Sequence, residues 1–431
     1  MCDLLIFLQV AVTKAIDGAE AEVASFSTGY FGEAALIDKS PRAANVKARG
    51  PLQCLCIGRE GFEEVLGPLQ SIIDEDRWRR ERLAAERLRG QEAEGLAGLS
   101  RNDFKLKACV SSNETSELVR ATHLATGGAY TLRGSSKSRA EASGMAPRLV
   151  AEAALLAELG AASPFVPLAL GQWHDATHLY SLFKLRVVAD LQQLLDAEGP
   201  LTEAEACFYG ASVALGLAHL HATERLALRS LAPDALALDE QGRVVILDLR
   251  FAARPEGGAL GDMCGAGLYL APEQVAQLGH STEVDYWALG VLLFQMVSGS
   301  VPWVDEAEDA DSVPETDLYH RIATHRFGGV ATAKLGLSAA LGELINGLLH
   351  PDPAQRLGCG AAPLTAHRWF EGLDVAALLR GAVEPPSRPC DWCRRAEAAI
   401  ASGPPAENLL SAPAPAGDAA WSNAFGSAAE S

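Results

Sequence analysis

The sequence predicts an α+β protein that is built from two or three folding units. At 431 residues the chain exceeds the size of one ordinary hydrophobic core. Apolar runs at 235–238 and 244–247 flank an Asp-Glu-Gln-Gly turn, which is typical of a β-hairpin. Apolar residues also recur at helical spacing over 149–159 and 203–221. Strands and helices are therefore both expected.

The composition is that of an acidic globular protein. Apolar residues make up 48% and charged residues 21% of the chain, and the formal net charge is -19. Nucleic acids and acidic lipids are bound by clustered Lys and Arg, so we expect neither as a main partner. The apolar opening 4–12 has no basic leader and is too short to span a bilayer. We therefore expect a strand there, no secretory signal and no membrane span.

The nine cysteines are scattered and lack the paired spacing of a zinc site. Cys390 and Cys393 form a single C-x-x-C pair, which we interpret as reduced surface thiols. Free thiols are typical of a reducing compartment, so we expect a cytoplasmic protein.

The N-terminal segment predicts a β-hairpin and then an anion site. Strand-like runs at 4–12 and 20–26 surround an Asp-Gly turn. Gly32 then precedes a short helical turn, whose free N–H groups favour an anion. Arg42, ten residues further on, can pair with that anion through its planar fork. The small Ala43-Ala44 pair that follows lets the backbone approach a ligand closely.

This stretch resembles the phosphate-binding cassette of the cyclic-nucleotide-binding domains in cyclic-AMP- and cyclic-GMP-dependent protein kinases. The resemblance implies that Gly32, Ala43 and Ala44 line the nucleotide, that Glu33 accepts from the ribose 2′-hydroxyl, and that Arg42 clamps the cyclic phosphate. Ala43 stands where cyclic-GMP-selective members carry Thr or Ser, which favours cyclic AMP or weak selectivity. The resemblance covers the second half of the usual β-roll, so we expect a partial domain with an open sheet edge over residues 1–73.

A helical linker is predicted over residues 74–103. Between residues 74 and 89, Arg and Glu alternate at helical spacing with few apolar positions. Such a pattern is typical of a solvated helix that connects two domains.

Residues 228–250 resemble the catalytic loop, hairpin and metal-binding turn of a eukaryotic protein kinase. Ser230 stands where the base Asp belongs, and Ala235 stands where the metal-binding Asn belongs. Asp248 remains as the candidate metal ligand, and Arg250 replaces the Gly that follows it in the family pattern. The scaffold of the pattern is present while most of its chemistry is changed.

The small-lobe positions are changed in the same way. Residues 109–118 match the loop that normally closes over the ATP phosphates, and they contain no Gly. Arg133 matches the phosphate-pairing Lys, and Glu152 matches its helix partner, which implies an Arg133–Glu152 ion pair. The candidate catalytic residues are therefore Asp248, Arg133 and Glu152, and we expect Mg-ATP binding to be weak or absent.

Residues 264–273 resemble the end of an activation segment, with Ala-Pro-Glu at its close. Asp262 stands where the activating phospho-Thr normally stands, and Arg229 survives as its usual partner. We weigh a fixed Asp262–Arg229 pair, which would replace the phosphorylation switch, against an unpaired loop acid. The resemblance also implies that a Glu273–Arg356 pair holds the large lobe together.

The resemblance implies a two-lobed protein-kinase fold over residues 104–370, with an AGC-type tail over 371–431. Trp421 and Phe425 resemble the tail aromatics that dock on the small lobe. Three functions remain open: a pseudokinase that acts as a regulatory or scaffold protein with a protein partner, an active cyclic-nucleotide-dependent Ser/Thr kinase, and a cyclic-nucleotide sensor whose kinase lobe only binds a partner.

Overall fold

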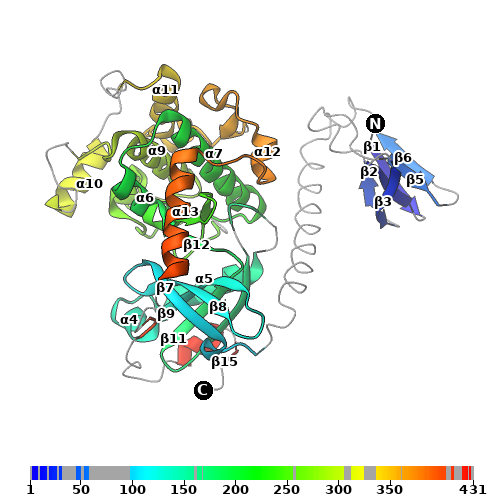
Figure 1. Cartoon of the computed structure of the whole chain (residues 1–431). Coiled ribbons are helices and arrows are strands. Elements are labelled where there is room, and N and C mark those ends of the chain that lie inside the picture. The colour runs from blue at the N-terminus through cyan, green and yellow to red at the C-terminus, as the bar shows by residue number, and fades with distance from the viewer. Residues whose placement is uncertain are drawn as a thin grey trace. The chain divides into compact units, whose positions relative to one another are not determined.

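The computed structural model divides the chain into two compact units, residues 1–80 and 81–431, and each is described by itself (Figure 1). The structure describes residues 2–7, 10–16, 19–26, 29–31, 45–49, 53–57, 98–159, 163–166, 168–255, 259–304, 312–324, 336–360, 362–403, 409–411, 420–425 and 427–428.

The first unit contains two three-stranded antiparallel sheets, with strand orders β4-β1-β6 and β3-β2-β5. Its strands are β1 (Cys2–Phe7), β2 (Val10–Ile16), β3 (Ala19–Phe26), β4 (Gly29–Phe31), β5 (Asn45–Ala48) and β6 (Gln53–Ile57). The predicted hairpin is present, with Ile16 opposite Ala19 in β2 and β3. The single strand expected over 4–12 is wrong, because these residues belong to β1 and β2, which lie in different sheets.

The cassette predicted to bind a cyclic nucleotide lies outside the described residues, as do its candidate ligands Gly32, Glu33, Arg42, Ala43 and Ala44. Most of the predicted linker helix also lies outside them.

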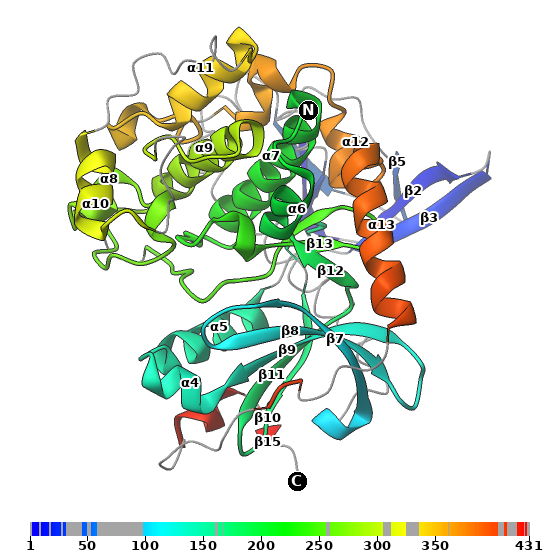
Figure 2. The same cartoon turned by 60° about the vertical axis from the view of Figure 1, so that its left-hand side comes forward.

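The second unit begins with a lobe built on a six-stranded sheet of order β15-β10-β11-β9-β8-β7 (Figures 1 and 2). Its elements are β7 (Phe104–Ser112), β8 (Ser116–His123), β9 (Ala129–Ser136), α4 (Lys137–Ala142), α5 (Ala146–Glu158), β10 (Ala169–His174), β11 (His178–Phe183) and β15 (Ser427–Ala428). Trp173 stacks between Phe104 and Tyr180, with ring centroids 5.9 and 5.4 Å away. This aromatic stack fills one side of the small-lobe core.

The larger lobe is mainly helical. Its elements are β12 (Val187–Asp190), α6 (Leu191–Glu198), α7 (Glu203–Ala218), β13 (Leu236–Asp239), β14 (Val244–Ile246), α8 (Pro272–Val275), α9 (Glu283–Ser298), α10 (Glu315–Thr324), α11 (Ala339–Leu348) and α12 (Val375–Leu379). Helices α7 and α9 are apolar on nearly every side, as expected for helices inside a large core. Thr202 starts α7 with a capping box to Glu205, which satisfies the free N–H groups of the first turn.

The predicted hairpin of the large lobe is confirmed. Leu236 pairs with Ile246 and Leu238 with Val244 across antiparallel strands β13 and β14. Gly242 in the connecting turn has a φ of +83°, a conformation that side-chain-bearing residues rarely adopt. The chain thus has the α+β, two-lobed architecture that its motifs predict, and the segment between β11 and β12 leads from one lobe to the other.

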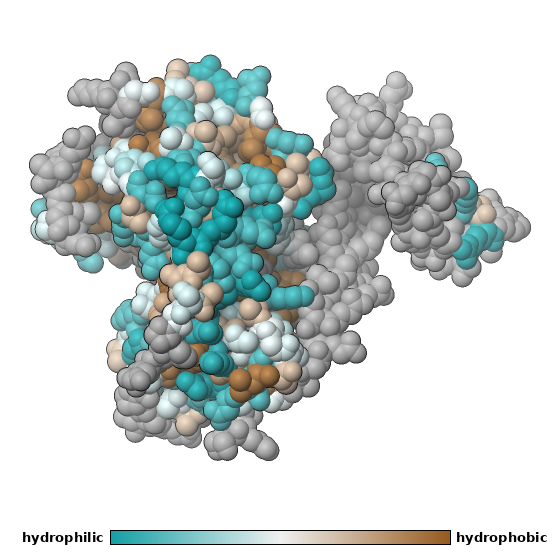
Figure 3. Space-filling model, in the orientation of Figure 1, coloured by the Kyte–Doolittle hydropathy of each residue, from teal (hydrophilic) through white to brown (hydrophobic). Residues whose placement is uncertain are grey.

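A long helix of the C-terminal segment, α13 (Ser387–Ser402), contacts both lobes (Figure 2). Arg388 pairs with Glu205 of α7, and Glu397 pairs with Arg120 of β8. In the space-filling view, hydrophilic residues predominate on the outer face of this helix (Figure 3). Its inner face holds Cys393, which is buried, so the expectation of a surface thiol at that position is wrong.

The tail aromatics pack on the small lobe, in the η10 turn (Ala420–Phe425). Phe425 is buried beside Leu149 and Leu179. The Trp421 indole Nε1 donates to Glu141 Oε1 at 2.9 Å. The predicted contact between this tail motif and the small lobe is therefore present.

Among the helices that the structure describes, none combines the length and the apolar character needed to cross a membrane.

Candidate active-site cleft

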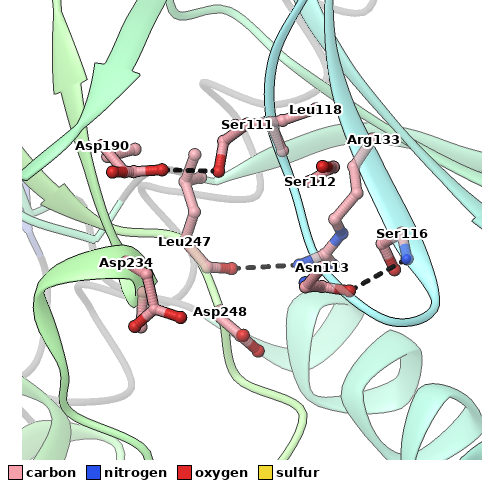
Figure 4. A pocket seen from close by; sticks show the side chains of 12 residues that line it. Ser111, Ser112, Asn113, Ser116, Leu118, Arg133, Asp190, Asp234, Leu247 and Asp248 are labelled. Atoms are coloured by element: carbon pink, nitrogen blue, oxygen red, sulfur yellow. Dashed lines mark hydrogen bonds between the residues drawn. The ribbon is translucent and has the colours of Figure 1, made fainter. Parts of the chain in front are cut away.

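A pocket lies between the two lobes of the second unit and is lined by residues from both (Figure 4). The β7–β8 hairpin contributes Ser111, Asn113 and Ser116, and the large lobe contributes Asp234 and Asp248. The cavity has a volume of about 50 Å³, which is enough for a few water molecules.

Arg133 and Glu152 form the ion pair that the sequence predicts. Arg133 Nη1 donates to Glu152 Oε1 at 2.8 Å and to the Leu247 carbonyl at 3.2 Å. The same Glu152 oxygen accepts from the backbone N–H of Leu249 at 2.9 Å. Burial raises the pKa of Glu152, and the nearby guanidinium opposes that effect. The pair therefore ties β9, α5 and the segment around Asp248 together.

The guanidinium group of Arg250 pairs with both carboxylate oxygens of Asp248. Its Nε lies 2.9 Å from Asp248 Oδ1, its Nη2 lies 2.6 Å from Oδ2, and its backbone N–H donates to Oδ1 at 3.1 Å. Burial alone would raise the pKa of Asp248, but the adjacent guanidinium outweighs burial and lowers it. Asp248 is thus held as an anion by a side chain two residues away.

The tip of the β7–β8 loop is closed by its own side chain. Asn113 Oδ1 accepts from the backbone N–H groups of Thr115 and Ser116 at 3.1 and 2.9 Å. The Thr115 carbonyl accepts from the Ser136 N–H at 2.8 Å, and Thr115 is fully buried. Loop N–H groups are natural anion donors, so this arrangement satisfies internally the groups that would otherwise face a phosphate.

A hydrogen bond across the mouth of the cleft joins the two lobes. Ser111 Oγ, at the end of β7, donates to Asp190 Oδ2 at 2.8 Å (Figure 4). The other oxygen of Asp190 caps helix α6 through the Gln193 N–H at 2.8 Å. The small-lobe loop is therefore anchored to the start of a large-lobe helix.

The loop at residues 228–235 is held by a buried carboxylate. Asp285 accepts the backbone N–H groups of Leu228 and Arg229, both at 2.7 Å, and contacts His221 Nε2 at 2.7 Å. These bonds hold Arg229 at a φ of +61°, which is unusual for a side-chain-bearing residue. Ser230 is buried, and its hydroxyl turns back to the Leu228 carbonyl at 3.4 Å.

Asp262 makes the predicted pair with Arg229 and also pairs with a second arginine. Arg229 Nη1 lies 2.5 Å from Asp262 Oδ1, and Arg148 Nη2 of helix α5 lies 2.6 Å from Oδ2. Partial burial raises the pKa of Asp262, but the two guanidinium groups outweigh it and hold the pKa well below its ordinary value. The alternative of an unpaired loop acid is wrong.

The Glu273–Arg356 pair is also present, and it is buried. The two side chains make a bidentate contact, with N–O distances of 2.6 and 3.0 Å. Arg356 further donates to the Glu283 carbonyl and lies over the Trp287 ring, 5.3 Å from its centroid. This pair anchors the end of the 264–273 segment to helix α9.

The sequence missed three parts of this site. Arg148 precedes Glu152 by one helical turn, so its spacing could have placed it on the same face of α5. The sequence marked Arg250 as a substitution but did not indicate that its side chain would fold back onto Asp248. Nothing in a single Asn predicts that Asn113 would cap its own loop.

The two positions that match the metal ligands of the kinase pattern are Asp248 and Ala235. Both carboxylate oxygens of Asp248 accept hydrogen bonds from Arg250, so a metal ion at this carboxylate would compete with the guanidinium. Ala235 lines the pocket and has no ligand atom. Within the described part of the chain, no group of three or more His, Cys, Asp or Glu side chains is placed to hold a metal ion.

Two lobes, a cleft with a Glu–Arg pair and an anchored loop beside Asp248 define a kinase-like protein. Residues 109–370 match the family model for the protein kinase domain, and residues 9–67 match the model for the cyclic nucleotide-binding domain. The kinase match covers more than half of the chain, which therefore belongs to the protein kinase family.

Its relatives are kinases that depend on cyclic nucleotides. The chain is 28% identical over 384 residues to cGMP-dependent protein kinase, isozyme 1, of Drosophila melanogaster, covering 85% of this chain and 48% of the relative. It is 31% identical over 229 residues to the human cAMP-dependent protein kinase catalytic subunit PRKX, covering 52% and 60%. It is 28% identical over 367 residues to the cGMP-dependent protein kinase of Toxoplasma gondii, covering 84% and 34%. The chain thus spans about a third to three fifths of these relatives.

Proposed function

We propose that this chain is a pseudokinase that acts as a regulatory or scaffold protein in cyclic-nucleotide signalling. The observation that carries the proposal is the clasp of Asp248 by Arg250, which occupies the remaining candidate metal ligand. Ser230 and Ala235 add to it, because neither side chain supplies the carboxylate base or the amide ligand that kinase chemistry uses.

Phosphoryl transfer depends on positioning and on charge stabilisation by several groups that act together. Loss of a general base typically removes about 10²–10⁴-fold in rate. Loss of a charge-stabilising group costs a further factor of about 10²–10³. With the base, the metal ligand and the loop glycines all changed, the expected residual turnover is negligible.

The structural pairs of the fold are retained, which supports a scaffold role. Glu273–Arg356 and the Asp285 contacts to the 228–229 backbone are buried and well formed. Such groups maintain the lobe without touching a phosphate. The proposal is that the second unit binds a protein partner and that the first unit binds cyclic AMP or cyclic GMP through Glu33 and Arg42.

A cytoplasmic setting is part of the proposal. The six cysteines whose side chains the structure describes are free thiols, which is typical of a reducing compartment.

An active Ser/Thr kinase is the second candidate, and the Arg133–Glu152 pair favours it. That pair is formed at 2.8 Å, as it would be in a lobe arranged for catalysis. In this alternative, Arg250 moves aside and Asp248 binds one metal ion.

Phosphotransfer from labelled ATP to a mixed Ser/Thr peptide library separates the two candidates. The full chain is assayed with and without each cyclic nucleotide, and a cooperative melt establishes that it is folded. The control is the Asp248→Asn/Arg250→Gln double variant, which removes the carboxylate while keeping the local charge balanced. Incorporation that disappears in the control would overturn the pseudokinase proposal. We expect no incorporation above that of the control.

A further inference from the structure

The substitutions in the cleft are connected to one another. Besides its bonds to Asp248, Arg250 places Nη1 3.4 Å from Thr115 Oγ1, at the tip of the β7–β8 loop. The same Thr115 presents its N–H to Asn113 Oδ1. A continuous set of contacts therefore runs from the large-lobe acid, through one guanidinium, to the small-lobe loop.

We propose that the clasp of Asp248 by Arg250, together with the self-capped β7–β8 loop, excludes divalent metal ions and metal-bound nucleoside triphosphates from this cleft. This inference rests on the proposed function and deepens it. It makes Arg250 the main obstacle to nucleotide binding, with the capped loop as a second one, and does not attribute the exclusion to all of the substitutions together.

The charges of the cleft support this assignment. Arg250 and Asp248 neutralise each other, as do Arg133 and Glu152. A divalent ion at Asp248 would displace the guanidinium hydrogen bonds and would then stand beside a positive charge. Arg250 thus already provides the positive charge that a metal ion would bring to Asp248.

The acids that remain in the cleft act against a bare nucleotide. Asp234 and Asp190 line the same pocket, and Asp190 is held in place by Ser111. Like charges repel, so triphosphate oxygens entering without a metal would meet these carboxylates. The nearest small-lobe N–H donors, those of Thr115 and Ser116, are already bonded to Asn113.

The location of Arg250 makes the proposal testable by a single substitution. Arg250→Ala removes the guanidinium and leaves Asp248 free in a pocket that still contains Arg133. Arg254→Ala is the matched control, because Arg254 lies four residues away and pairs at 2.9 Å with Glu158, whereas Arg250 pairs with Asp248. The Arg250→Ala/Asp248→Asn double variant removes the restored ligand again.

The experiment titrates ATP into the full chain by calorimetry, with and without magnesium, for the wild type and the three variants. We expect no binding by the wild type or by Arg254→Ala. Arg250→Ala is expected to bind Mg-ATP with a dissociation constant about tenfold or more below the weakest one that the wild-type titration would detect. This gain should require magnesium and should be absent from the double variant.

Three results would overturn the proposal. They are Mg-ATP binding by the wild type as tight as that of Arg250→Ala, ATP binding by the wild type without magnesium, and no gain in an Arg250→Ala protein that melts cooperatively. If Arg250→Ala does not fold, Arg250→Gln carries the same test, because Gln is neutral and keeps part of the side-chain length.

Binding and phosphotransfer measurements test the role of Arg250 and the pseudokinase proposal separately. Mg-ATP binding by the wild type without phosphotransfer would refute the role of Arg250 and leave the pseudokinase proposal standing. Phosphotransfer by the wild type would refute the pseudokinase proposal itself. Binding by Arg250→Ala without transfer is the result expected if both are correct, since Ser230 and Ala235 are unchanged.

Discussion

At the scale of single residues, the role of an acidic side chain in this protein depends more on its neighbours than on its residue type. Asp248 is the acid that the family pattern retains, yet the arginine two residues away makes it one half of an internal ion pair. Asp262 shows the converse, because an ordinary loop acid becomes a fixed anchor between Arg148 and Arg229. Both carboxylates have pKa values lowered by their arginine partners, which outweigh burial in each case.

Asp262 should contribute stability that depends on pH. Its folded-state pKa lies below the ordinary value of 3.8, so the unfolded chain binds its proton first as the pH falls. The contribution is therefore present above about pH 4 and is lost as the pH falls further, toward the folded-state pKa. We expect Asp262→Asn to lower stability at pH 7 by less than about 1 kcal/mol, because the Asp262 side chain is 46% exposed and water screens the interaction.

Urea unfolding of the wild type and Asp262→Asn at pH 7 and at pH 3 measures this difference. Asp391→Asn is the control, because Asp391 makes an exposed pair with Arg394 on the surface of α13. A difference for Asp262→Asn that persists unchanged at the lower pH would contradict the assignment.

Residue-level prediction succeeded where a motif fixes both partners and failed where a side chain turns back on its own loop. Arg133 and Glu152 occupy matched positions of one pattern, so their pairing followed from the resemblance. The contacts of Asn113 and Arg250 depend on loop conformation and on rotamers that no spacing rule describes. Local backbone geometry was the missing information.

At the scale of elements, α13 is the part of the fold that the sequence did not predict. Pro386 precedes it, and its inward residues Pro389, Cys393, Ala396 and Ile400 follow a helical spacing. We interpreted the C-x-x-C pair as surface thiols, whereas Cys393 is buried and packs against the lobes. The helix was therefore detectable from its period, but its docking on two lobes was not.

Arg388 should be the main anchor of α13. It makes a bidentate contact with Glu205, at 2.9 and 2.6 Å, and also donates to the carbonyls of Glu198 and Pro200. Charge-assisted bonds of this kind contribute about 1–2 kcal/mol once their partial exposure is taken into account. We expect Arg388→Ala to lower the free energy of unfolding by about that amount.

Arg394→Ala is the matched control, because Arg394 lies on the exposed face of the same helix and pairs only with Asp391 among the described contacts. Hydrogen exchange adds a local readout, since loosening of α13 should raise exchange in β12 and at Arg120 of β8. Equal effects of the two substitutions would show that Arg388 is not an anchor.

At the scale of the whole molecule, the chain combines two units that should respond to ligands separately. The first unit comprises residues 1–80 and matches a cyclic-nucleotide-binding family over most of its length. Differential scanning calorimetry of the full chain is expected to resolve two transitions. A cyclic nucleotide at 100 times its dissociation constant should stabilise the first unit by about 2.7 kcal/mol and leave the larger transition in place.

Arg42→Gln is the control for that measurement, because the proposal makes Arg42 the clamp of the cyclic phosphate. Cyclic AMP and cyclic GMP are compared in parallel with 5′-AMP, which lacks the cyclic phosphate. A shift of neither transition by either cyclic nucleotide would refute ligand binding by the first unit.

The two-lobed architecture was predictable because its hairpins, buried helices and structural ion pairs all follow sequence patterns. The contacts across the cleft were not, because they join segments that are far apart in the chain, such as Ser111 with Asp190. Sequence patterns predict individual strands and helices, whereas the contacts in a cleft depend on how those elements pack together.

The anchor at Asp262 has a consequence for control in the cell. A phosphate on a loop is added by a kinase and removed by a phosphatase, so a loop that is ordered by phosphorylation can be switched in both directions. Here the two arginines are held by a carboxylate that the ribosome installs. No phosphatase can remove it, so this anchor is not reversed by dephosphorylation.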